Sequence, residues 1–162
     1  MRGRGTWDND RPPIFSVVAR NLGIVRYFVG KHADSATCLD VVRKTAPAWL
    51  SWLYTDEHNG YGPVEDELHI LHSSVKHSRD GDRPREWARD DDGDGIREVH
   101  CNSCEGAGAG LRTYLRAFRG VHKKYLASYV ATYETMLNAK RISAEVVCRM
   151  CFGLHAPQPK VT

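Results

Sequence analysis

A polar turn that runs into a long helical stretch constrains this chain most. The stretch Arg97-Glu-Val-His-Cys-Asn-Ser-Cys-Glu-Gly106 begins as a charged lead-in and ends in this turn, and the turn carries one carboxylate, Glu105. The helix expected after it spaces Arg112, Arg116 and Arg119 at i, i+4 and i+7, which places three guanidinium groups on one face. A carboxylate at a helix start beside a row of guanidiniums suits a metal site that handles phosphate groups.

The segments upstream of this turn predict strands and short helices. Residues 14–20 and 24–29 are expected to form a hairpin, because Asn21-Leu-Gly23 between them is typical of a turn. Ser35 is the expected N-cap of a helix that ends near Ala46. A strand is expected at 48–55, a short acidic helix at 64–68 and another strand at 69–75. With the helices downstream, this order predicts an α/β fold with a mixed sheet flanked by helices.

The clearest periodic pattern lies between residues 123 and 140. Apolar and aromatic residues recur there at helical spacing: Tyr125, Leu126, Tyr129, Val130, Tyr133, Met136 and Leu137. We interpret them as core rather than as a platform on which bases stack. A last helix is expected from Ser143 to about Phe152.

The length of 162 residues fits one domain with a core of its own. Residues 1–11 are expected to be a disordered lead-in, 12–153 the folded domain and 154–162 a tail. Residues 78–95 have almost no apolar content, so we expect an acidic, mobile insertion there. No stretch approaches the roughly 20 apolar residues of a membrane span, and no apolar signal-peptide region is present. We therefore expect a cytoplasmic protein with no membrane partner.

The net charge of +3 conceals an asymmetry along the chain. From Cys101 onward there are nine Lys and Arg against three Asp and Glu, a balance of +6, whereas the first hundred residues carry fourteen against seventeen, a balance of −3. A basic C-terminal third indicates a polyanionic partner. The alternative is a solvated helical face with no partner.

A second carboxylate candidate, Asp56, follows an apolar strand. Carboxylates at the end of a strand are exposed at a sheet edge, where ligands tend to bind. If Asp56 and Glu105 converge on Mg²⁺, they form part of a two-metal phosphodiester site, whose ions lie roughly 3.5–4 Å apart. The alternative is that they are two unrelated surface acids.

Three sequence blocks together resemble a known enzyme family. They are Tyr54-Thr-Asp-Glu57, Val99-His-Cys-Asn-Ser-Cys-Glu-Gly106 and Phe118-Arg-Gly-Val-His-Lys-Lys-Tyr-Leu126. Their order and spacing resemble the insertion-sequence DDE transposases with a ribonuclease-H-like core, in the family whose third motif reads H-x-N-x-x-E-G. The resemblance runs from about Asp10 to Phe152, and Asp10-Arg-Pro-Pro-Ile-Phe15 is similar to that family's entry into its second strand.

The resemblance implies roles for individual residues. Asp56 and Glu105 would be the second and third carboxylates of the triad and would hold Mg²⁺ or Mn²⁺. His100 and Asn102 would support Glu105. The DNA phosphates at the transposon end would be contacted by Arg112, Arg116, Arg119, Lys123 and Lys124, and such binding weakens steeply with salt. Transposon-end and target DNA are the implied partners, and a homo-oligomer is left open.

Two departures from the family pattern are evident. The family's first Asp lies on a first strand upstream of the segment matching Asp10–Phe15, and here nine residues without strand character precede that segment, with Asp8 a poor substitute. That strand is central in a ribonuclease-H-like sheet, so its loss would leave two strand edges unpaired. Gly108 stands where the family has an aromatic residue, and two glycines in an early helical turn cost roughly 1 kcal/mol each. We therefore expect a truncated or decaying copy that is inactive alone.

The main rival interpretation is a zinc-stabilised nucleic-acid-binding module without catalysis. Cys101, Cys104, Cys148 and Cys151 form two C-x-x-C pairs, and four thiolates close a tetrahedral zinc site. Two predicted helices separate the pairs, however, and Cys148 and Cys151 share an apolar helical face, where cysteine is an ordinary small hydrophobe. Zn²⁺ is therefore a less favoured ligand than Mg²⁺.

Two further alternatives remain. Asp90-x-Asp92-x-Asp94-Gly95 is similar to the start of an EF-hand loop, but position twelve is Cys101 instead of Glu, so we favour a solvated acidic loop. The chain also fits a host-adapted protein that keeps the fold and the DNA-binding helices without the chemistry. Specific DNA binding without Mg²⁺-dependent cleavage would favour that interpretation.

Overall fold

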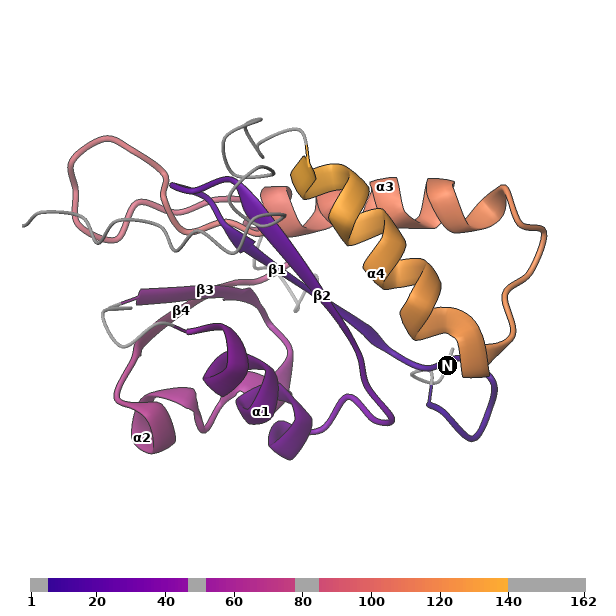
Figure 1. Cartoon of the computed structure of the whole chain (residues 1–162). Coiled ribbons are helices and arrows are strands. Elements are labelled where there is room, and N and C mark those ends of the chain that lie inside the picture. The colour runs from indigo at the N-terminus through magenta and orange to yellow at the C-terminus, as the bar shows by residue number, and fades with distance from the viewer. Residues whose placement is uncertain (1–5, 47–51, 78–84, 140–162) are drawn as a thin grey trace, which may run out of the picture.

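The computed structural model describes residues 6–46, 52–77 and 85–139. Five longer elements follow one another in the N-terminal half: β1 (Ile14–Ala19), β2 (Ile24–Val29), α1 (Ser35–Thr45), β3 (Trp52–Asp56) and β4 (Leu71–Val75). A 3-10 turn, η1 (Asn59–Tyr61), and the short helix α2 (Val64–Leu68) lie between β3 and β4. Two long helices, α3 (Asn102–Arg116) and α4 (Lys123–Ala139), complete the fold (Figure 1).

The predicted hairpin is confirmed. β1 and β2 pair antiparallel from Ile14↔Val29 to Ala19↔Ile24. Gly23 adopts φ +59, the left-handed region that glycine enters at little cost, and the Leu22 N–H donates to Ala19 O at 3.1 Å to close the turn. Side chains alternate between the two faces of β1, as the period of a strand requires.

The hairpin is covered on both faces. Ile14 and Val18 pack with Val25 and Tyr27 against Leu111, Leu126 and Val130 of α3 and α4. Phe15 and Val17 point to the opposite face and pack against Cys38 and Val41 of α1. Figure 1 shows α3 and α4 on one side of the hairpin and α1 on the other. Of the residues expected to form the core side of α4, Leu126 and Val130 are buried, whereas Tyr125 and Met136 are exposed.

The N-cap of α1 differs from the prediction by one residue. Asp34 has extended backbone geometry, and its Oδ1 accepts from the Thr37 N–H at 2.9 Å. Ser35, the predicted cap, is instead the first helical residue. The carboxylate of Asp34 also accepts from the Thr37 hydroxyl at 2.7 Å, so it satisfies two donors at the helix start.

The second strand pair is parallel, with Trp52 opposite Leu71 and Asp56 opposite Val75. The strand expected at 48–55 is described only from Trp52, and it extends to Asp56, which is its last residue. The helix expected at 64–68 is confirmed, and the strand expected from His69 begins at Leu71 because His69 is the left-handed C-cap of α2, with φ +55.

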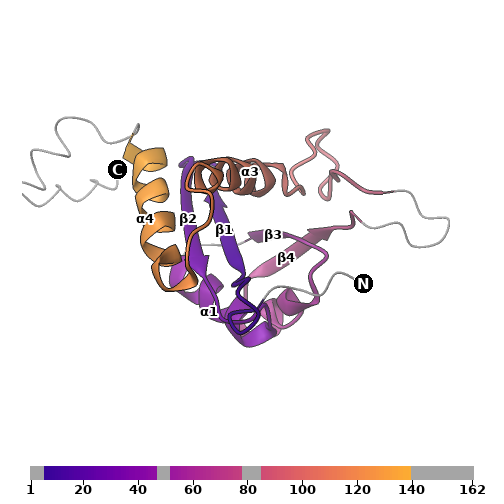
Figure 2. The same cartoon turned by 90° about the vertical axis from the view of Figure 1, so that its right-hand side faces the viewer.

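The four strands form two separate sheets, β1–β2 and β3–β4, instead of one mixed sheet. Figure 2 shows β1 and β3 next to each other, with β2 and β4 on the outer sides. The protein is a mixed α/β fold, and the ribonuclease-H-like arrangement stays a prediction. No described helix is both long enough and apolar enough to cross a membrane.

Three predicted segments fall partly or wholly outside the described residues. The lead-in is described from Thr6, and there the Trp7 N–H donates to Lys31 O at 2.9 Å. Within 78–95 the description begins at residue 85, and Arg89 and Val99 form an isolated antiparallel bridge. The helix expected from Ser143 to Phe152 and the tail at 154–162 lie outside the described residues.

Candidate metal and nucleic-acid site

Asp56 lies at the end of β3, where the strand gives way to a loop. Its side chain is exposed, and Oδ1 accepts from the backbone N–H of His58 at 3.2 Å. This Asx-type bond turns the chain away from the strand and fixes the carboxylate at the strand end. The strand that carries it is held by pairing with β4, so the carboxylate stands on a rigid element.

Glu105 lies in the first turn of α3, where the partial positive charge of the helix start favours a carboxylate. Its Oε1 lies 3.1 Å from His77 Nδ1, and the Glu105 side chain is half exposed while that of His77 is largely buried. The His77 ring packs on Trp87, with ring centroids 5.1 Å apart. Trp87 therefore orients the imidazole that holds the carboxylate.

Asp56 and Glu105 line one cavity of about 1690 Å³, together with His77, His100 and Asn102. Their negative charges also act on the same two thiols. Burial, the Cys104 thiol and the carboxylates of Asp56 and Glu105 raise the pKa of Cys101 to about 12. Burial likewise raises the pKa of Cys104, with both carboxylates adding to the effect. Asp56 on β3 and Glu105 on α3 thus line the same open cavity, and their convergence on one metal stays a prediction.

The residues present fit part of a divalent-metal site. Carboxylate oxygens are the ligands that Mg²⁺ and Mn²⁺ prefer, and Mg²⁺ commonly uses one or two carboxylates plus water and substrate phosphate. Glu57 also lines the cavity. In the described part of the chain, Asp56, Glu105 and His77 do not form a group of ligand atoms within 4.8 Å of one another. A metal would therefore draw them closer or be bridged by water.

His100 lies just before α3, and Asn102 begins the helix. Arg20 Nη1 lies 2.8 Å from His100 Nε2, and the guanidinium also lies 4.7 Å from the centre of the Tyr54 ring. Burial and the nearby Arg20 charge lower the pKa of His100. Asn102 is the first residue of α3 and is exposed to the cavity. The pair Arg20–His100 ties the end of β1 to the entry of α3.

His77 and Arg20 were not predicted as site residues. His77 follows a strand without any motif around it, and Arg20 was assigned only to the end of a strand. Both act through contacts with residues distant in sequence, Glu105 and His100, which no local pattern reports. The signal that was available is that Asp56 ends β3 and His77 lies two residues past the end of β4, so both lie at the same end of one parallel strand pair.

The basic stripe expected on one helical face is shorter than predicted. Arg112 and Arg116 are exposed on α3, but the helix ends at Arg116. Arg119 has φ +53 in the turn that follows, so it leaves the helical spacing. The reason is that the chain turns at Arg119 and Gly120 to bring α4 back onto β2. Arg112 lines the cavity that contains Asp56 and Glu105.

Lys123 and Lys124, also predicted to contact DNA, differ in their surroundings. Lys123 Nζ lies 2.9 Å from Asp10 Oδ1 and donates to Trp7 O at 2.9 Å, so its charge is already paired. The same pair lowers the pKa of Asp10, first through the hydrogen bond and then through the charge of Lys123. Lys124 is exposed and lies over the Tyr125 ring at 5.6 Å. Lys124 is therefore the more available of the two for a phosphate.

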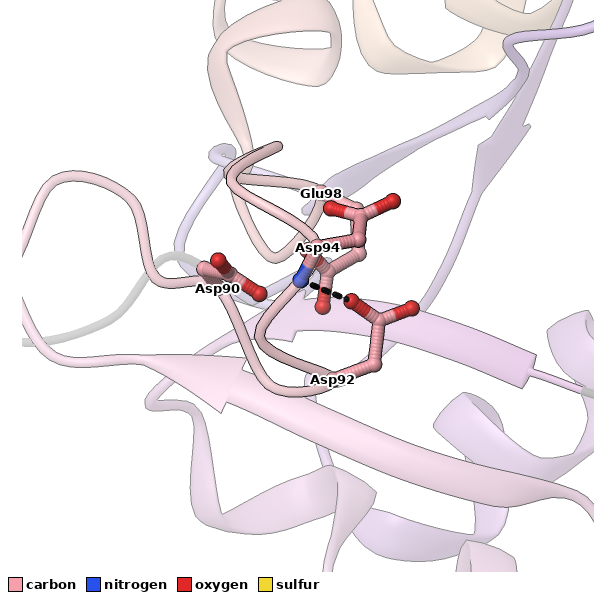
Figure 3. A group of neighbouring side chains, drawn as sticks. All are labelled: Asp90, Asp92, Asp94 and Glu98. Atoms are coloured by element: carbon pink, nitrogen blue, oxygen red, sulfur yellow. Dashed lines mark hydrogen bonds between the residues drawn. The ribbon is translucent and has the colours of Figure 1, made fainter.

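The acidic loop forms a second cluster of carboxylates (Figure 3). Ligand atoms of Asp90, Asp92, Asp94 and Glu98 lie within 4.8 Å of one another. The carboxylate of Asp90 accepts from the Gly93 N–H at 2.7 Å and from the Gly95 N–H at 2.9 Å, which lowers its pKa. Asp92 and Asp94 are exposed, as in the solvated loop favoured from the sequence.

Only two of the four cysteines of the zinc alternative, Cys101 and Cys104, lie among the described residues. Cys101 is buried with Val75 and Val99, and Cys104 is partly buried; both are free thiols. The backbone of Val18, on β1, acts in the opposite direction to burial and lowers the pKa of Cys104, so β1 lies close to this thiol. Cys148 and Cys151 lie outside the described residues, so the zinc interpretation stays a prediction.

Comparison with known proteins finds an informative relative. The chain is 26% identical over 134 residues to an "Uncharacterized protein in transposable element ISH50" of Halobacterium salinarum (strain ATCC 700922 / JCM 11081 / NRC-1). The match covers 82% of this chain and 41% of the relative, so the chain spans about two fifths of that protein's length. This relative supports a transposable-element origin for the chain. No protein-family model matches the chain, and no solved structure matches it.

Proposed function

We propose that this chain is part of a DDE-type DNA transposase that cleaves and joins DNA at the ends of an insertion element. The observation that carries the proposal is that Asp56 and Glu105, on β3 and α3, line one cavity. The match to a protein of a transposable element supports the same role from an independent direction. The three sequence blocks that resemble the transposase family include both of these carboxylates.

Asp56 and Glu105 would hold Mg²⁺ or Mn²⁺, which when bound supplies charge stabilisation and orientation to a phosphodiester. The chain's own residues prepare that site. His77 holds Glu105 by the 3.1 Å contact, and the Asp56 carboxylate is fixed by the His58 N–H. Asp56 stands on a paired strand and Glu105 on a helix, so the backbone of the site is preorganised for a phosphate group, while the two side chains would still have to move toward a metal.

DNA would approach from the side of the cavity where α3 exposes its arginines. Arg112 lines the cavity and Arg116 lies one helical turn further along the same helix. Arg119 and Lys124 extend the basic surface into the turn and the start of α4. These side chains would bind phosphates and position the strand, while the carboxylates lie at the reacting bond.

The proposed site lacks one counterpart in the part of the chain that the structure describes. A DDE triad needs three carboxylates, and none of the described strands carries a counterpart of the family's first Asp. Within the described part of the chain, the carboxylates that line the cavity are Asp56, Glu57 and Glu105. We therefore expect the isolated chain to bind metal and DNA weakly and to leave DNA uncut.

The test is the affinity of the purified chain for a labelled duplex that ends at the element's terminus, measured with Mg²⁺ and with EDTA. Mg²⁺ is expected to raise the affinity, because Asp56 and Glu105 would hold it and it would supply positive charge for a phosphate. Asp56→Asn and Glu105→Gln should each remove that increase, whereas Asp66→Asn, on α2 outside the cavity, should keep it. Equal affinity with Mg²⁺ and with EDTA in the unmodified chain would contradict the proposal.

A further inference from the structure

The turn that joins α3 to α4 carries exposed aromatic rings beside cations. It lies at the opposite end of α3 from the acidic loop (Figure 1). Phe118 in the turn is 42% exposed, and Tyr125 in the first turn of α4 is 55% exposed. Each ring has a cation next to it in the sequence, Arg119 after Phe118 and Lys124 before Tyr125. We call the surface formed by these four side chains the turn surface.

Tyr129 brings the two exposed rings to the same side of the turn. The Phe118 ring meets the Tyr129 ring edge-on, with centroids 4.7 Å apart. Tyr125 precedes Tyr129 by four residues on α4, so the two side chains share a helical face. Tyr133, four residues further on, packs against the hydrophobic core of the hairpin. The row of tyrosines that the sequence assigns to the core therefore begins in solvent, at the turn surface.

The turn surface lies in a stretch of chain without negative charge. Residues 106–133 contain five Lys and Arg and no Asp or Glu. Among the described residues, the exposed guanidinium groups of Arg116 and Arg119 make no ion pair or hydrogen bond. Lys123, by contrast, is paired with Asp10. Unpaired cations next to exposed aromatic rings are the two components of a surface that binds single-stranded nucleic acid.

The backbone at Arg119 is held in an uncommon conformation. Its φ of +53 lies in the left-handed region, which residues other than glycine rarely enter, and Gly120 follows with φ +131. A Cβ at Gly120 would meet no atom within 4 Å, so the space beside Arg119 is open. Strained residues of this kind cluster at sites that hold ligands. The strain at Arg119 is therefore a second observation that marks the turn surface as a binding site.

The exposed rings favour unpaired DNA over duplex DNA as the ligand. In a duplex the faces of the bases are stacked on one another, and contacts to the phosphates need only donors and cations. An unpaired base offers its face to an aromatic ring, and such stacking tolerates every base. Arg119 and Lys124 alone would suffice for a duplex, whereas the exposure of Phe118 and Tyr125 fits a ligand with accessible bases.

We infer that the turn surface binds unpaired nucleotides of DNA, whose bases stack on Phe118 and Tyr125 and whose phosphates contact Arg119 and Lys124. That the ligand is DNA rests on the proposed function, and that it is single-stranded at this turn rests on the exposed rings. α3 links this surface to the cavity, because Glu105 lies in its first turn and Arg116 in its last. A strand that follows α3 from the turn surface would pass Arg112 and reach the cavity.

The test measures, in EDTA, the affinity of the full chain for two labelled oligonucleotides of about 12 nucleotides, a usual site size for such surfaces. One is single-stranded oligothymidylate. The other is its abasic analogue, which keeps every phosphate and lacks the bases. The oligothymidylate is expected to bind at least about tenfold more tightly, because stacking adds to the phosphate contacts that both ligands make. Both affinities should fall as the salt concentration rises.

Variants separate the rings from the cations. Tyr125→Ala and Phe118→Leu each remove one ring, and leucine keeps an apolar side chain against Tyr129. Each should weaken binding of the oligothymidylate about tenfold and leave binding of the abasic analogue unchanged. Arg119→Asn removes the cation with a residue that tolerates the left-handed backbone, and it should weaken both ligands alike. The matched control is Met136→Ala, another exposed apolar position on α4, which should change neither affinity.

Three results would overturn the inference. One is equal affinity for the oligothymidylate and its abasic analogue. Another is a preference for the oligothymidylate that Tyr125→Ala and Phe118→Leu leave intact. The third is that a polyglutamate peptide binds as tightly as the oligothymidylate and loses affinity in the same two variants, which would assign the turn surface to an acidic protein.

The outcome is distinguishable from that of the proposed function. Because this assay contains EDTA, its failure would leave the Mg²⁺-dependent binding of a duplex end intact. Loss of that Mg²⁺ effect, in turn, would leave the stacking of unpaired bases at the turn surface intact.

Discussion

Arg20 Nη1 lies 2.8 Å from His100 Nε2, across 80 residues of sequence. A guanidinium only donates, so Nε2 is the acceptor and the ring proton is on Nδ1, which is buried without a partner among the described residues. The contact therefore requires a neutral His100. Burial and the Arg20 charge both lower the pKa of His100, in agreement with that requirement.

Removal of this arginine should raise the pKa of His100. Arg20→Ala deletes the cation, and the pKa should move toward the ordinary value of about 6.5, whereas Arg20→Lys keeps the charge and should shift it less. The pKa is measured by NMR titration of the imidazole protons. In the unmodified protein, His100 of the unfolded state takes up a proton below about pH 6.5, whereas His100 of the folded state resists protonation. The free energy of unfolding therefore falls as the pH drops. An unchanged His100 pKa in Arg20→Ala would contradict this account.

Two of the three glycines of α3, Gly108 and Gly110, should respond differently to alanine. A Cβ added at Gly108 would meet only ordinary contacts, the nearest being Arg112 Nη1 at 3.7 Å, so Gly108→Ala should stabilise the protein by about 0.5–1 kcal/mol. At Gly110 a Cβ would collide with the hydroxyl oxygen of Tyr133, whose ring is packed 5.0 Å from that of Tyr114. Gly110→Ala should therefore destabilise the protein.

Chemical denaturation of the two variants measures the difference, and each serves as the control for the other. If Gly110→Ala stabilises the protein as much as Gly108→Ala does, a Cβ at position 110 does not collide with Tyr133 of α4, and this prediction is contradicted.

Glu134 protects the outer edge of the hairpin. Glu134→Ala should cost about 1–3 kcal/mol because the Tyr27 N–H loses its acceptor, and the ion pair with Arg26 at 2.8 Å is lost as well. The freed edge should also promote self-association. Urea denaturation and sedimentation velocity measure the two effects. Thr132→Ala, at an exposed position on the same helix, is the control and should change neither.

The zinc interpretation predicts one tightly held zinc per chain, and our account predicts none. Elemental analysis of protein purified without chelators distinguishes them. Cys104→Ser would lower the zinc content only if that cysteine is a ligand. One zinc per chain that Cys104→Ser removes would move the assignment to a zinc-stabilised nucleic-acid-binding module.

The elements that could be predicted from the sequence are those whose signals are local. The hairpin of residues 14–29 has a turn between two apolar runs, and α2 begins directly after Pro63, so both were found. Asp34 was missed as a cap because two adjacent polar residues both fit the pattern and only the backbone geometry of Asp34 decides. Arg119 was assigned to a helical face although Gly120 directly after it is a helix-end signal, because that signal does not say how many residues before the glycine the helix ends.

The candidate site also divides into residues that have a local sequence signal and residues whose place depends on tertiary contacts. The positions of Asp56 at a strand end and of Glu105 at a helix start could be predicted because each stands at the junction of a recognisable element, whereas their role at a metal stays a prediction. His77 and Arg20, which orient residues of the site, could not be predicted from the sequence. His77 reaches Glu105, and Arg20 reaches His100, only after β1, β4 and α3 have packed, so tertiary contacts decide their roles. The separation of the strands into two sheets also depends on tertiary pairing.

The most direct test of the account is where Mn²⁺ binds, because paramagnetic broadening of NMR signals reports the residues near the ion. The acidic loop is first neutralised with Asp92→Asn and Asp94→Asn so that it does not compete. We predict that Mn²⁺ then broadens signals of His77 and Glu105, and that adding Asp56→Asn or Glu105→Gln removes the effect. Broadening that is absent from this cavity, or that persists unchanged in both carboxylate variants, would contradict a metal site formed by Asp56 and Glu105.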